Sequence, residues 1–279
     1  AWDDSISPRE RFVCVQAMTV DEDGMLWILD PGNPLMSGVL RGAAKLVAVN
    51  LATNKVVWQI NFSPVIATPD SYLNDLRVDS GNRTIYLTES GTGAIIVIDM
   101  DTSEARKVLG DHPSTKAEDI AITIEGTPWL GPDGATPRIH SDGIALSPDR
   151  EWIYYQALTG RTLYRIPSAA LRDAASRNPS MDAEALGAQV ETVAESGVAD
   201  GILFGPDGVL YLTALEENAL NRLSPGHELE RWLQDDRLKW PDSFSLGPEG
   251  YLYVTTAQIH LGGEAEAPFG LWRVKLTDD

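Results

Sequence analysis

The segment Ser141-Asp-Gly-Ile-Ala-Leu-Ser-Pro-Asp-Arg-Glu-Trp-Ile-Tyr decides the fold of this chain, because four other segments repeat its pattern. Each segment consists of a polar residue, a short apolar run, a tight turn and a second run that contains an aromatic residue. The other four occupy residues 16–28, 74–86, 199–211 and 241–253. Hairpins repeated at intervals of roughly 40 to 70 residues are typical of a β-propeller. The sequence therefore predicts an all-β propeller.

One polar position recurs when the five segments are aligned on their turns. The turns lie at Asp23, Gly81, Asp149, Asp207 and Glu249. The position seven residues before each turn holds Gln16, Asn74, Asp142, Asp200 and Asp242. If the blades are arranged radially, these five side chains would ring one mouth of the central channel.

Further apolar runs extend each hairpin towards a four-stranded blade. The predicted strands of the first two units lie at residues 25–29, 45–51, 56–60, 74–78, 84–88, 93–99 and 105–109. The fifth unit ends with residues 270–276, one strand short of four. Two insertions interrupt the pattern. Residues 111–140 are rich in proline and glycine and predict an ordered loop, and residues 168–175 predict a short helix with Ser168 as its N-cap.

The composition of the chain argues against some classes of function. The net charge of −19 over 279 residues opposes nucleic-acid binding, because phosphate would be repelled. No run approaches the roughly 18 apolar residues of a membrane span. Cys14 is the single cysteine, so no intrachain disulfide forms, and we expect it to be a small buried side chain. We expect an extracellular or periplasmic location, although this cysteine usage leaves a cytoplasmic one open.

The chain resembles the major royal jelly protein and Yellow family, in its bacterial branch. The resemblance rests on residues 72–79, on residues 140–149 with 154–166, and on Trp240-Pro-Asp-Ser-Phe followed by Gln258-Ile-His. The family is distantly similar to the gluconolactonases and to the senescence marker protein. The resemblance implies a six-bladed propeller, whereas five units are present here. We therefore expect residues 1–279 to form a single propeller domain that lacks one N-terminal blade, with a closed five-bladed ring as the alternative.

The resemblance also implies a divalent cation, calcium before others, at three of the recurring polar positions. By motif, its ligands would be Asn74, Asp142 and Asp200. Calcium prefers carboxylate and amide oxygens, and takes six to eight of them. The relatives add a glutamate from another blade, and here that position is either absent or held by Gln16. In the structural alternative, each Asp-Gly pair caps backbone amides within its own blade. Direct ligand binding without a metal is the third interpretation.

Two functions from different classes follow. The first is a protein that binds a small molecule at the channel mouth without catalysis. The second is a metal-assisted hydrolase of a lactone, in which the cation polarises the carbonyl and lowers the pKa of a water. Since propellers host both functions, the fold alone does not separate them. The expected ligand-binding residues are Gln16, Asp75, Arg77, Glu89, His140, Gln156, Asp242, Gln258 and His260.

Overall fold

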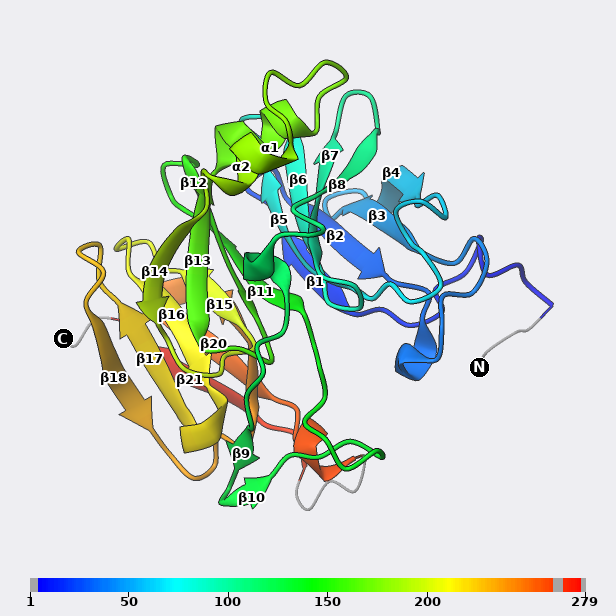
Figure 1. The fold of residues 1–279 in the computed structure, drawn as a ribbon. Coiled ribbons are helices and arrows are strands. Elements are labelled where there is room, and N and C mark those ends of the chain that lie inside the picture. The colour runs from blue at the N-terminus through cyan, green and yellow to red at the C-terminus, as the bar shows by residue number, and fades with distance from the viewer. Residues whose placement is uncertain (1–4, 263–267, 277–279) are drawn as a thin grey trace. The chain divides into compact units, whose positions relative to one another are not determined.

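Five antiparallel sheets follow one another along the chain in the computed structural model, which describes residues 5–262 and 268–276 (Figure 1). Each sheet is a meander in which successive strands pair, and we call the sheets blades 1 to 5. Blade 1 contains β1 (Ala17–Val20), β2 (Met25–Asp30), β3 (Lys45–Asn50) and β4 (Lys55–Asn61). Blade 2 contains β5 (Leu73–Asp79), β6 (Thr84–Glu89), β7 (Ala94–Asp99) and β8 (Ala105–Val108). All seven strands predicted for these blades are confirmed to within two residues.

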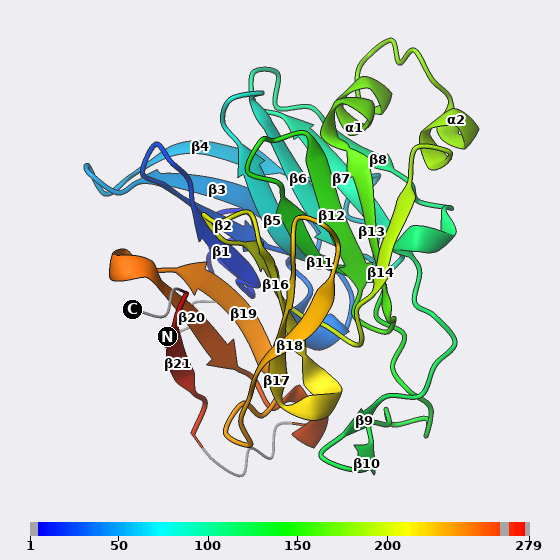
Figure 2. The ribbon, with the colours of Figure 1, turned by 90° about the vertical axis from the view of Figure 1, so that its left-hand side faces the viewer.

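The remaining blades repeat this order. Blade 3 contains β11 (Ser141–Leu146), β12 (Trp152–Ala157), β13 (Thr162–Pro167) and β14 (Glu191–Glu195). Blade 4 contains β15 (Ile202–Phe204), β16 (Leu210–Ala214), β17 (Ala219–Leu223) and β18 (Leu229–Gln234). Blade 5 contains β19 (Pro241–Leu246), β20 (Tyr251–Thr256) and β21 (Leu271–Lys275). Within the described residues blade 5 thus has three strands, as the sequence predicts (Figure 2).

The chain divides into two compact units. The first comprises residues 1–116 and 167–189 and holds blades 1 and 2. The second comprises residues 117–166 and 190–279 and holds blades 4 and 5 with nearly all of blade 3. The single propeller domain expected for residues 1–279 stays a prediction.

Each unit has an apolar core between neighbouring blades. In the first unit, Leu29 and Leu46 of blade 1 belong to the same buried cluster as Leu76 and Leu87 of blade 2. In the second unit, Leu163 of blade 3 clusters with Ile202, Leu210 and Leu212 of blade 4. In each unit, one row of apolar side chains on a strand thus packs against the next blade.

The two insertions differ in part from their predictions. Residues 111–140 are mostly loop, with a short hairpin of β9 (Thr123–Ile124) and β10 (Thr127–Pro128). Helix α1 (Ser168–Ala174) is confirmed, but its N-cap is Pro167 and not Ser168. The Ser168 hydroxyl lies inside the first turn and accepts a hydrogen bond from Arg172 at 3.1 Å, so it does not cap the helix. A second helix, α2 (Ala183–Gly187), follows α1 and has no counterpart among the predicted elements. No helix among the described residues is long and apolar enough to span a membrane.

Candidate functional site

The recurring polar position coincides with a β-bulge. In blades 2, 3 and 5, the register of the first two strands shifts at residues 73–76, 141–144 and 241–244. Asn74, Asp142 and Asp242 lie inside these shifts, and Asp200 of blade 4 comes two residues before β15. A bulge leaves a residue outside the ladder and re-aims side chains, and such bulges are common beside functional sites.

The glycine that follows the polar residue in blades 3 and 4 permits close packing of the first strands. A Cβ atom at Gly143 would lie 2.4 Å from the carbonyl oxygen of Asp200, and one at Gly201 would lie 2.2 Å from that of Asp242. Only glycine fits such distances. The Asp-Gly pairs therefore bring Asp142, Asp200 and Asp242 onto adjacent first strands of the second unit.

In the first unit, the structure brings Gln16 and Asn74 together. The Gln16 amide donates to Asn74 Oδ1 at 3.0 Å, and the Tyr72 hydroxyl donates to Gln16 Oε1. Asn74 Nδ2 donates to the Ser90 hydroxyl at 2.9 Å. The side-chain oxygen of Asn74 is thus already bound by an amide donor.

Asp75 and Arg77 lie beside this pair and interact with each other. The Arg77 guanidinium is 2.9 Å from one Asp75 carboxylate oxygen and donates to the other at 3.0 Å. The backbone N–H of Asp75 donates to Thr88 at 3.1 Å. These contacts fix Asp75 at the bulge and hold the guanidinium against its own strand.

An aromatic and acidic cluster surrounds Asp200 in the second unit. The Trp240 indole N–H donates to Asp200 Oδ2 at 2.8 Å, and the Trp240 ring stacks on His260 with centroids 5.8 Å apart. His260 Nε2 lies 3.4 Å from Glu125 Oε2, and Lys239 lies 3.2 Å from Glu125 Oε1. His260 Nδ1 is buried, and no residue in the described part of the chain forms a hydrogen bond with it. The cluster joins one predicted metal ligand, Asp200, to one predicted ligand-binding residue, His260.

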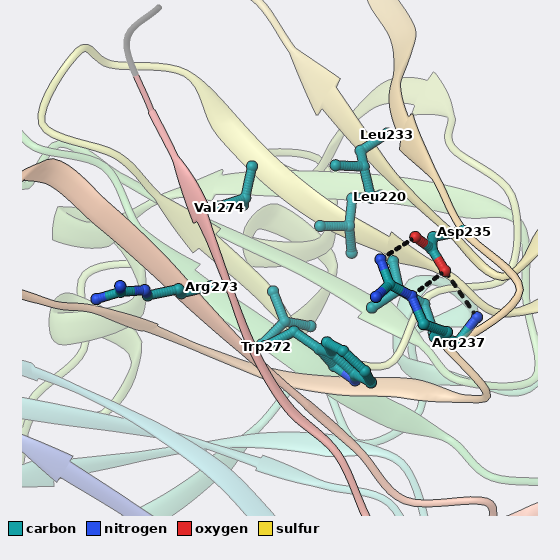
Figure 3. A pocket seen from close by; sticks show the side chains of 9 residues that line it. Leu220, Leu233, Asp235, Arg237, Trp272, Arg273 and Val274 are labelled. Carbon is teal, nitrogen blue, oxygen red and sulfur yellow. Dashed lines mark hydrogen bonds and ion pairs between the residues drawn. The ribbon is translucent and has the colours of Figure 1, made fainter.

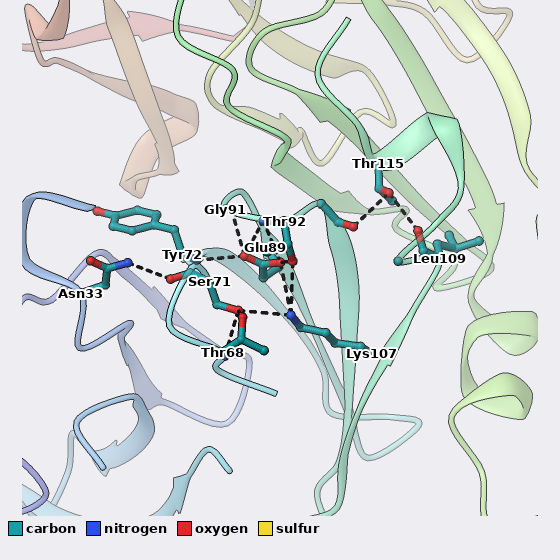
Figure 4. A network of polar contacts seen from close by, with 12 residues as sticks. Asn33, Thr68, Ser71, Tyr72, Glu89, Gly91, Thr92, Lys107, Leu109 and Thr115 are labelled. Carbon is teal, nitrogen blue, oxygen red and sulfur yellow. Dashed lines mark hydrogen bonds and ion pairs between the residues drawn. The ribbon is translucent and has the colours of Figure 1, made fainter. Parts of the chain in front are cut away.

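Three other residues that the sequence predicts to bind a ligand form hydrogen bonds with nearby backbone groups. Glu89 is fully buried at the end of β6 and accepts hydrogen bonds from the backbone of Tyr72, Gly91 and Thr92, with Lys107 3.4 Å away (Figure 4). Gln156 is also fully buried, and it donates to Gly197 O at 2.7 Å. These contacts close each blade internally. They favour a structural role for both side chains over contact with a ligand.

His140 is the third of these residues. Its Nδ1 accepts a hydrogen bond from the Ala117 backbone N–H at 2.8 Å. A general base needs a free ring nitrogen within reach of its proton donor, and Nδ1 is already engaged. The contact instead joins the start of β11 to the loop that precedes it.

A cavity lies at the end of blade 5 where β19 begins. Because Pro241 pairs with Thr256 and Leu271 pairs with Thr255, the start of β19, the end of β20 and the start of β21 share this end. The cavity measures about 490 Å³. Its wall contains the predicted residue Gln258, together with Asp236, Arg237, Lys239, Thr256, Pro268, Phe269, Gly270, Leu271 and Trp272.

The side-chain oxygens predicted to bind calcium suit such a hard cation only in part. Asp142 and Asp200 provide carboxylates on adjacent strands, as calcium prefers. However, Asn74 Oδ1 is bound by Gln16 and Asp200 Oδ2 by Trp240. Within residues 5–262 and 268–276, no three His, Cys, Asp or Glu residues gather in a way that would hold a metal ion. The cation therefore stays a prediction, with Asp142 and Asp200 as the side chains that would hold it.

Sequence reasoning missed the apolar wall of the cavity. Phe269 and Leu271 are each 68% exposed, and within residues 5–262 and 268–276 the buried Trp272 indole N–H has no hydrogen-bond partner. These residues lie outside the repeated hairpin on which the alignment rests. The run Phe269-Gly-Leu-Trp272 is the only signal in the sequence that could have indicated them.

Comparison with known proteins identifies the family of the chain and its fold. Residues 13–258 match the family described as Major royal jelly protein. Major royal jelly protein 6 of Apis mellifera is 22% identical over 231 residues, which is 80% of this chain and 50% of that protein. The chain thus spans about half the length of this curated relative.

Two solved structures share the fold at low sequence identity. A structure in a nidogen–laminin complex matches 87% of this chain and 72% of its own, with 14% identity and a TM-score of 0.55. A gluconolactonase of Xanthomonas campestris matches 88% of this chain and 69% of its own, with 12% identity and a TM-score of 0.54. These similarities confirm the β-propeller predicted from the hairpin repeat.

Proposed function

Because this chain belongs to the major royal jelly protein family, we propose that it binds a small organic molecule at the end of its blades where the first strands begin. The observation that carries the proposal is the cavity of about 490 Å³ at this end of blade 5. Its volume lies within the range of about 300 to 1,000 Å³ that is usual for small-molecule sites. The extracellular or periplasmic location is proposed on the same family membership.

The chemistry of the cavity wall supports this function. Ligand sites combine apolar and aromatic surface with a few polar groups that fix orientation. Here Phe269, Leu271 and Trp272 supply the apolar surface, while Lys239 and Gln258 supply polar groups. Among the described residues the buried Trp272 indole N–H has no hydrogen-bond partner, which is costly unless a ligand oxygen accepts from it. We therefore propose a ligand with a carbonyl, hydroxyl or carboxylate oxygen beside an apolar body.

Native mass spectrometry of the purified chain tests this proposal, because a ligand held in the cavity should add a reproducible mass. The compound released from that complex is then titrated against wild type and Phe269→Arg, which places a charged side chain in the apolar wall. We expect Phe269→Arg to weaken binding by about tenfold or more, equivalent to about 1.4 kcal/mol.

Leu246→Arg is the matched control, since Leu246 is 45% exposed and lies at the opposite end of β19. It should bind like wild type. Equal loss of binding in both variants would indicate a general effect of added charge and would contradict a site in this cavity. A chain that carries no added mass and binds no member of a library of small organic compounds would contradict the function itself.

Metal-assisted hydrolysis of a lactone is the second candidate. It is favoured by the placement of Asp142, Asp200 and Asp242 on adjacent first strands, because carboxylate oxygens are ligands that calcium prefers. Calorimetric titration with calcium tests it: binding should be strong in wild type and weak in Asp142→Ala and Asp200→Ala. Equal affinity in all three proteins would exclude the two aspartates as ligands.

A further inference from the structure

Another cavity lies between blades 3 and 4, at the end of these blades opposite to Asp142 and Asp200. Its volume is about 360 Å³. The turns that join β11 to β12, β15 to β16 and β17 to β18 form its rim, whereas Asp142 and Asp200 lie where the first strands begin. Among the described residues, this cavity and the one in blade 5 share no lining side chain. It is therefore a separate candidate site.

Blade 3 presents its second-strand tyrosine to this cavity, in contrast to blade 4. In blade 4, a Cβ atom at Gly205 would lie 2.8 Å from the Tyr211 ring, so the glycine lets that ring pack on its own turn. Ser147 holds the equivalent position before the turn of blade 3. The tyrosine of blade 3, Tyr154, lines the cavity and packs edge-on against Phe204 of blade 4, with ring centroids 5.1 Å apart. The tyrosine thus contacts the next blade.

A polar cluster lies beside the Tyr154 ring. The Arg165 guanidinium of β13 donates through Nη1 to the Tyr154 hydroxyl at 3.1 Å, and the same nitrogen lies 3.3 Å from His227 Nε2. The guanidinium also stacks on the Trp152 ring, 4.0 Å from its centroid. Since a guanidinium only donates, His227 Nε2 accepts and the imidazole is neutral. Burial, together with the positive charge of Arg165, lowers the pKa of His227 and favours this state.

Two contacts in this cluster are long. His227 Nε2 lies 3.3 Å from Arg165 Nη1 and 3.4 Å from the Tyr154 hydroxyl, whereas N–H···O hydrogen bonds cluster at about 2.9–3.0 Å. An N–H and an O–H thus share one distant acceptor. A carboxylate in the cavity could accept from both donors, and hydrogen bonds of charged groups are roughly twice as strong as neutral ones. The cluster therefore suits an anionic ligand oxygen.

The size and the remaining wall of the cavity suit a ring. Leu210 and Leu223 line it and belong to the buried cluster of blades 3 and 4, and Phe204 packs against that cluster. Small-molecule sites usually measure about 300 to 1,000 Å³. By comparison, the cavity between blades 4 and 5 measures about 90 Å³, and its wall contains Leu220 and Trp272 (Figure 3). Of these two cavities, only the one between blades 3 and 4 has the volume for an aromatic ring and its substituent.

We propose that the cavity between blades 3 and 4 binds an aromatic carboxylate. Its ring lies against Phe204 and Tyr154, and its carboxylate accepts from Arg165 and from the Tyr154 hydroxyl. A carboxylate fits better than a phosphate, because Glu191 pairs with Arg165 at 2.7 Å and Asp149 lies in the wall. These two acidic groups repel a dianion more strongly than a monoanion. The site is independent of the one proposed in blade 5.

Calorimetric titration of the chain with 2-naphthoate tests this site, and 2-naphthamide serves as a neutral probe of the same shape. We expect naphthoate to form a one-to-one complex with wild type and to bind about tenfold more tightly than the amide. Arg165→Gln should weaken naphthoate by about tenfold and naphthamide by less than about twofold, because the amide carries no charge. Tyr154→Phe removes one donor but keeps the ring, and should weaken naphthoate by about tenfold.

Two controls locate the probe. Arg222→Gln is the matched one, because Arg222 forms the equivalent ion pair of blade 4 with Glu230, at 2.6 Å, and does not line the cavity. It should bind naphthoate like wild type. Phe269→Glu places a negative charge in the wall of the blade 5 cavity and should also leave naphthoate binding unchanged. Loss of binding in Phe269→Glu would assign the probe to blade 5 and overturn the proposal.

Absence of saturable naphthoate binding to wild type, or equal affinity of wild type for the two probes, would also overturn the proposal. So would wild-type affinity for naphthoate in a folded Arg165→Gln or Tyr154→Phe chain. Circular dichroism shows which variants are folded. If Arg165→Gln does not fold, Tyr154→Phe decides the matter, because phenylalanine fills the same space as the tyrosine ring.

Discussion

Side chains at the ends of second strands bind backbone groups inside their own blades. Asp30 accepts from the backbone of Val13 at 2.6 Å and of Gly32 at 2.8 Å, and Lys45 lies 3.4 Å away. Glu89 repeats this arrangement in blade 2 with Lys107 as its cation. A buried carboxylate that satisfies several N–H groups stabilises the turn it occupies. We therefore expect Asp30 and Glu89 to contribute mainly to the stability of the folded chain.

Glu89→Gln should destabilise the chain, because it removes the charge that balances Lys107 and puts an amide donor where backbone N–H groups point. We expect a loss of about 1–3 kcal/mol in the free energy of unfolding, measured by urea denaturation. Glu104→Gln is the matched control, since Glu104 contacts Arg177 on the exposed surface and should leave the midpoint unchanged. Equal midpoints for Glu89→Gln and wild type would contradict a structural role for Glu89.

Cys14 differs from the expected small buried side chain, because it is only partly buried and lies next to a carboxylate. Its Sγ is 3.7 Å from Asp30 Oδ1. Burial, reinforced by the Asp30 charge, raises the pKa of the Cys14 thiol from 9.0 to about 11. The thiol should therefore be a poor nucleophile at neutral pH.

The rate of alkylation of Cys14 by iodoacetamide, measured against pH, should have its midpoint near 11 in the folded chain. In urea the midpoint should fall to about 9, the ordinary thiol value. Because the folded pKa is raised, the contribution of this group to stability is complete below pH 9 and is lost as pH rises towards 11. A midpoint near 9 in the folded chain would contradict the effect of burial.

At the scale of the element, the bulge and the glycine that follows it position the first strand of a blade. Thr88 and Thr255 on second strands accept from the bulged residues Asp75 and Ser243, at 3.1 and 3.2 Å. The Thr213 hydroxyl accepts from Asp200 in blade 4 at 2.8 Å. A hydroxyl from the second strand thus replaces the ladder bond that the irregular first strand lacks.

Gly143→Ala and Gly201→Ala should each destabilise the second unit, because the added methyl would overlap a carbonyl oxygen of the next blade. Relief requires the first strands to move apart, at a cost of about 1–3 kcal/mol. Urea denaturation followed by tryptophan fluorescence measures the change. Gly110→Ala is the control, since a Cβ atom there meets nothing within 4 Å and its midpoint should equal that of wild type.

At the scale of the whole molecule, the path of the chain links the two units. It passes between them after residues 116, 166 and 189, and β13 of blade 3 continues into helix α1 without a linker. Helix α1 in turn contacts blade 2, where Arg172 lies 3.6 Å from the buried carboxylate of Asp79. Neither unit is a continuous stretch of sequence.

We therefore expect thermal unfolding in a single cooperative transition, in keeping with the single domain that the sequence predicts. Near-ultraviolet circular dichroism and tryptophan fluorescence should report the same midpoint, and the calorimetric and van't Hoff enthalpies should agree. Two separated transitions would show that the units unfold independently.

The amino-acid pattern alone predicts the repeating hairpin, the strand bounds of blades 1 and 2, the three strands of blade 5 and the recurring polar position. These features follow from local physics. Alternating apolar residues define a strand, and turn residues such as Asp149 and Asp207 end it within a few positions. The helix at residues 168–175 was also predictable, whereas its cap was not, because the Ser168 hydroxyl binds Arg172 instead of a backbone N–H.

The contacts of each polar residue depend on the packing of the folded chain and could not be predicted from the sequence. The sequence predicts all of Glu89, Gln156, His140, Asp200 and Gln258 as site residues. The first three bind backbone groups nearby, whereas the last two lie beside the aromatic cluster or the cavity. The difference depends on which backbone N–H and C=O groups lie within about 3 Å, a distance set by packing between segments far apart in sequence. The strand at residues 271–275 was predictable from its apolar run, but the register that sets Arg273 opposite Tyr253 became visible only in the structure.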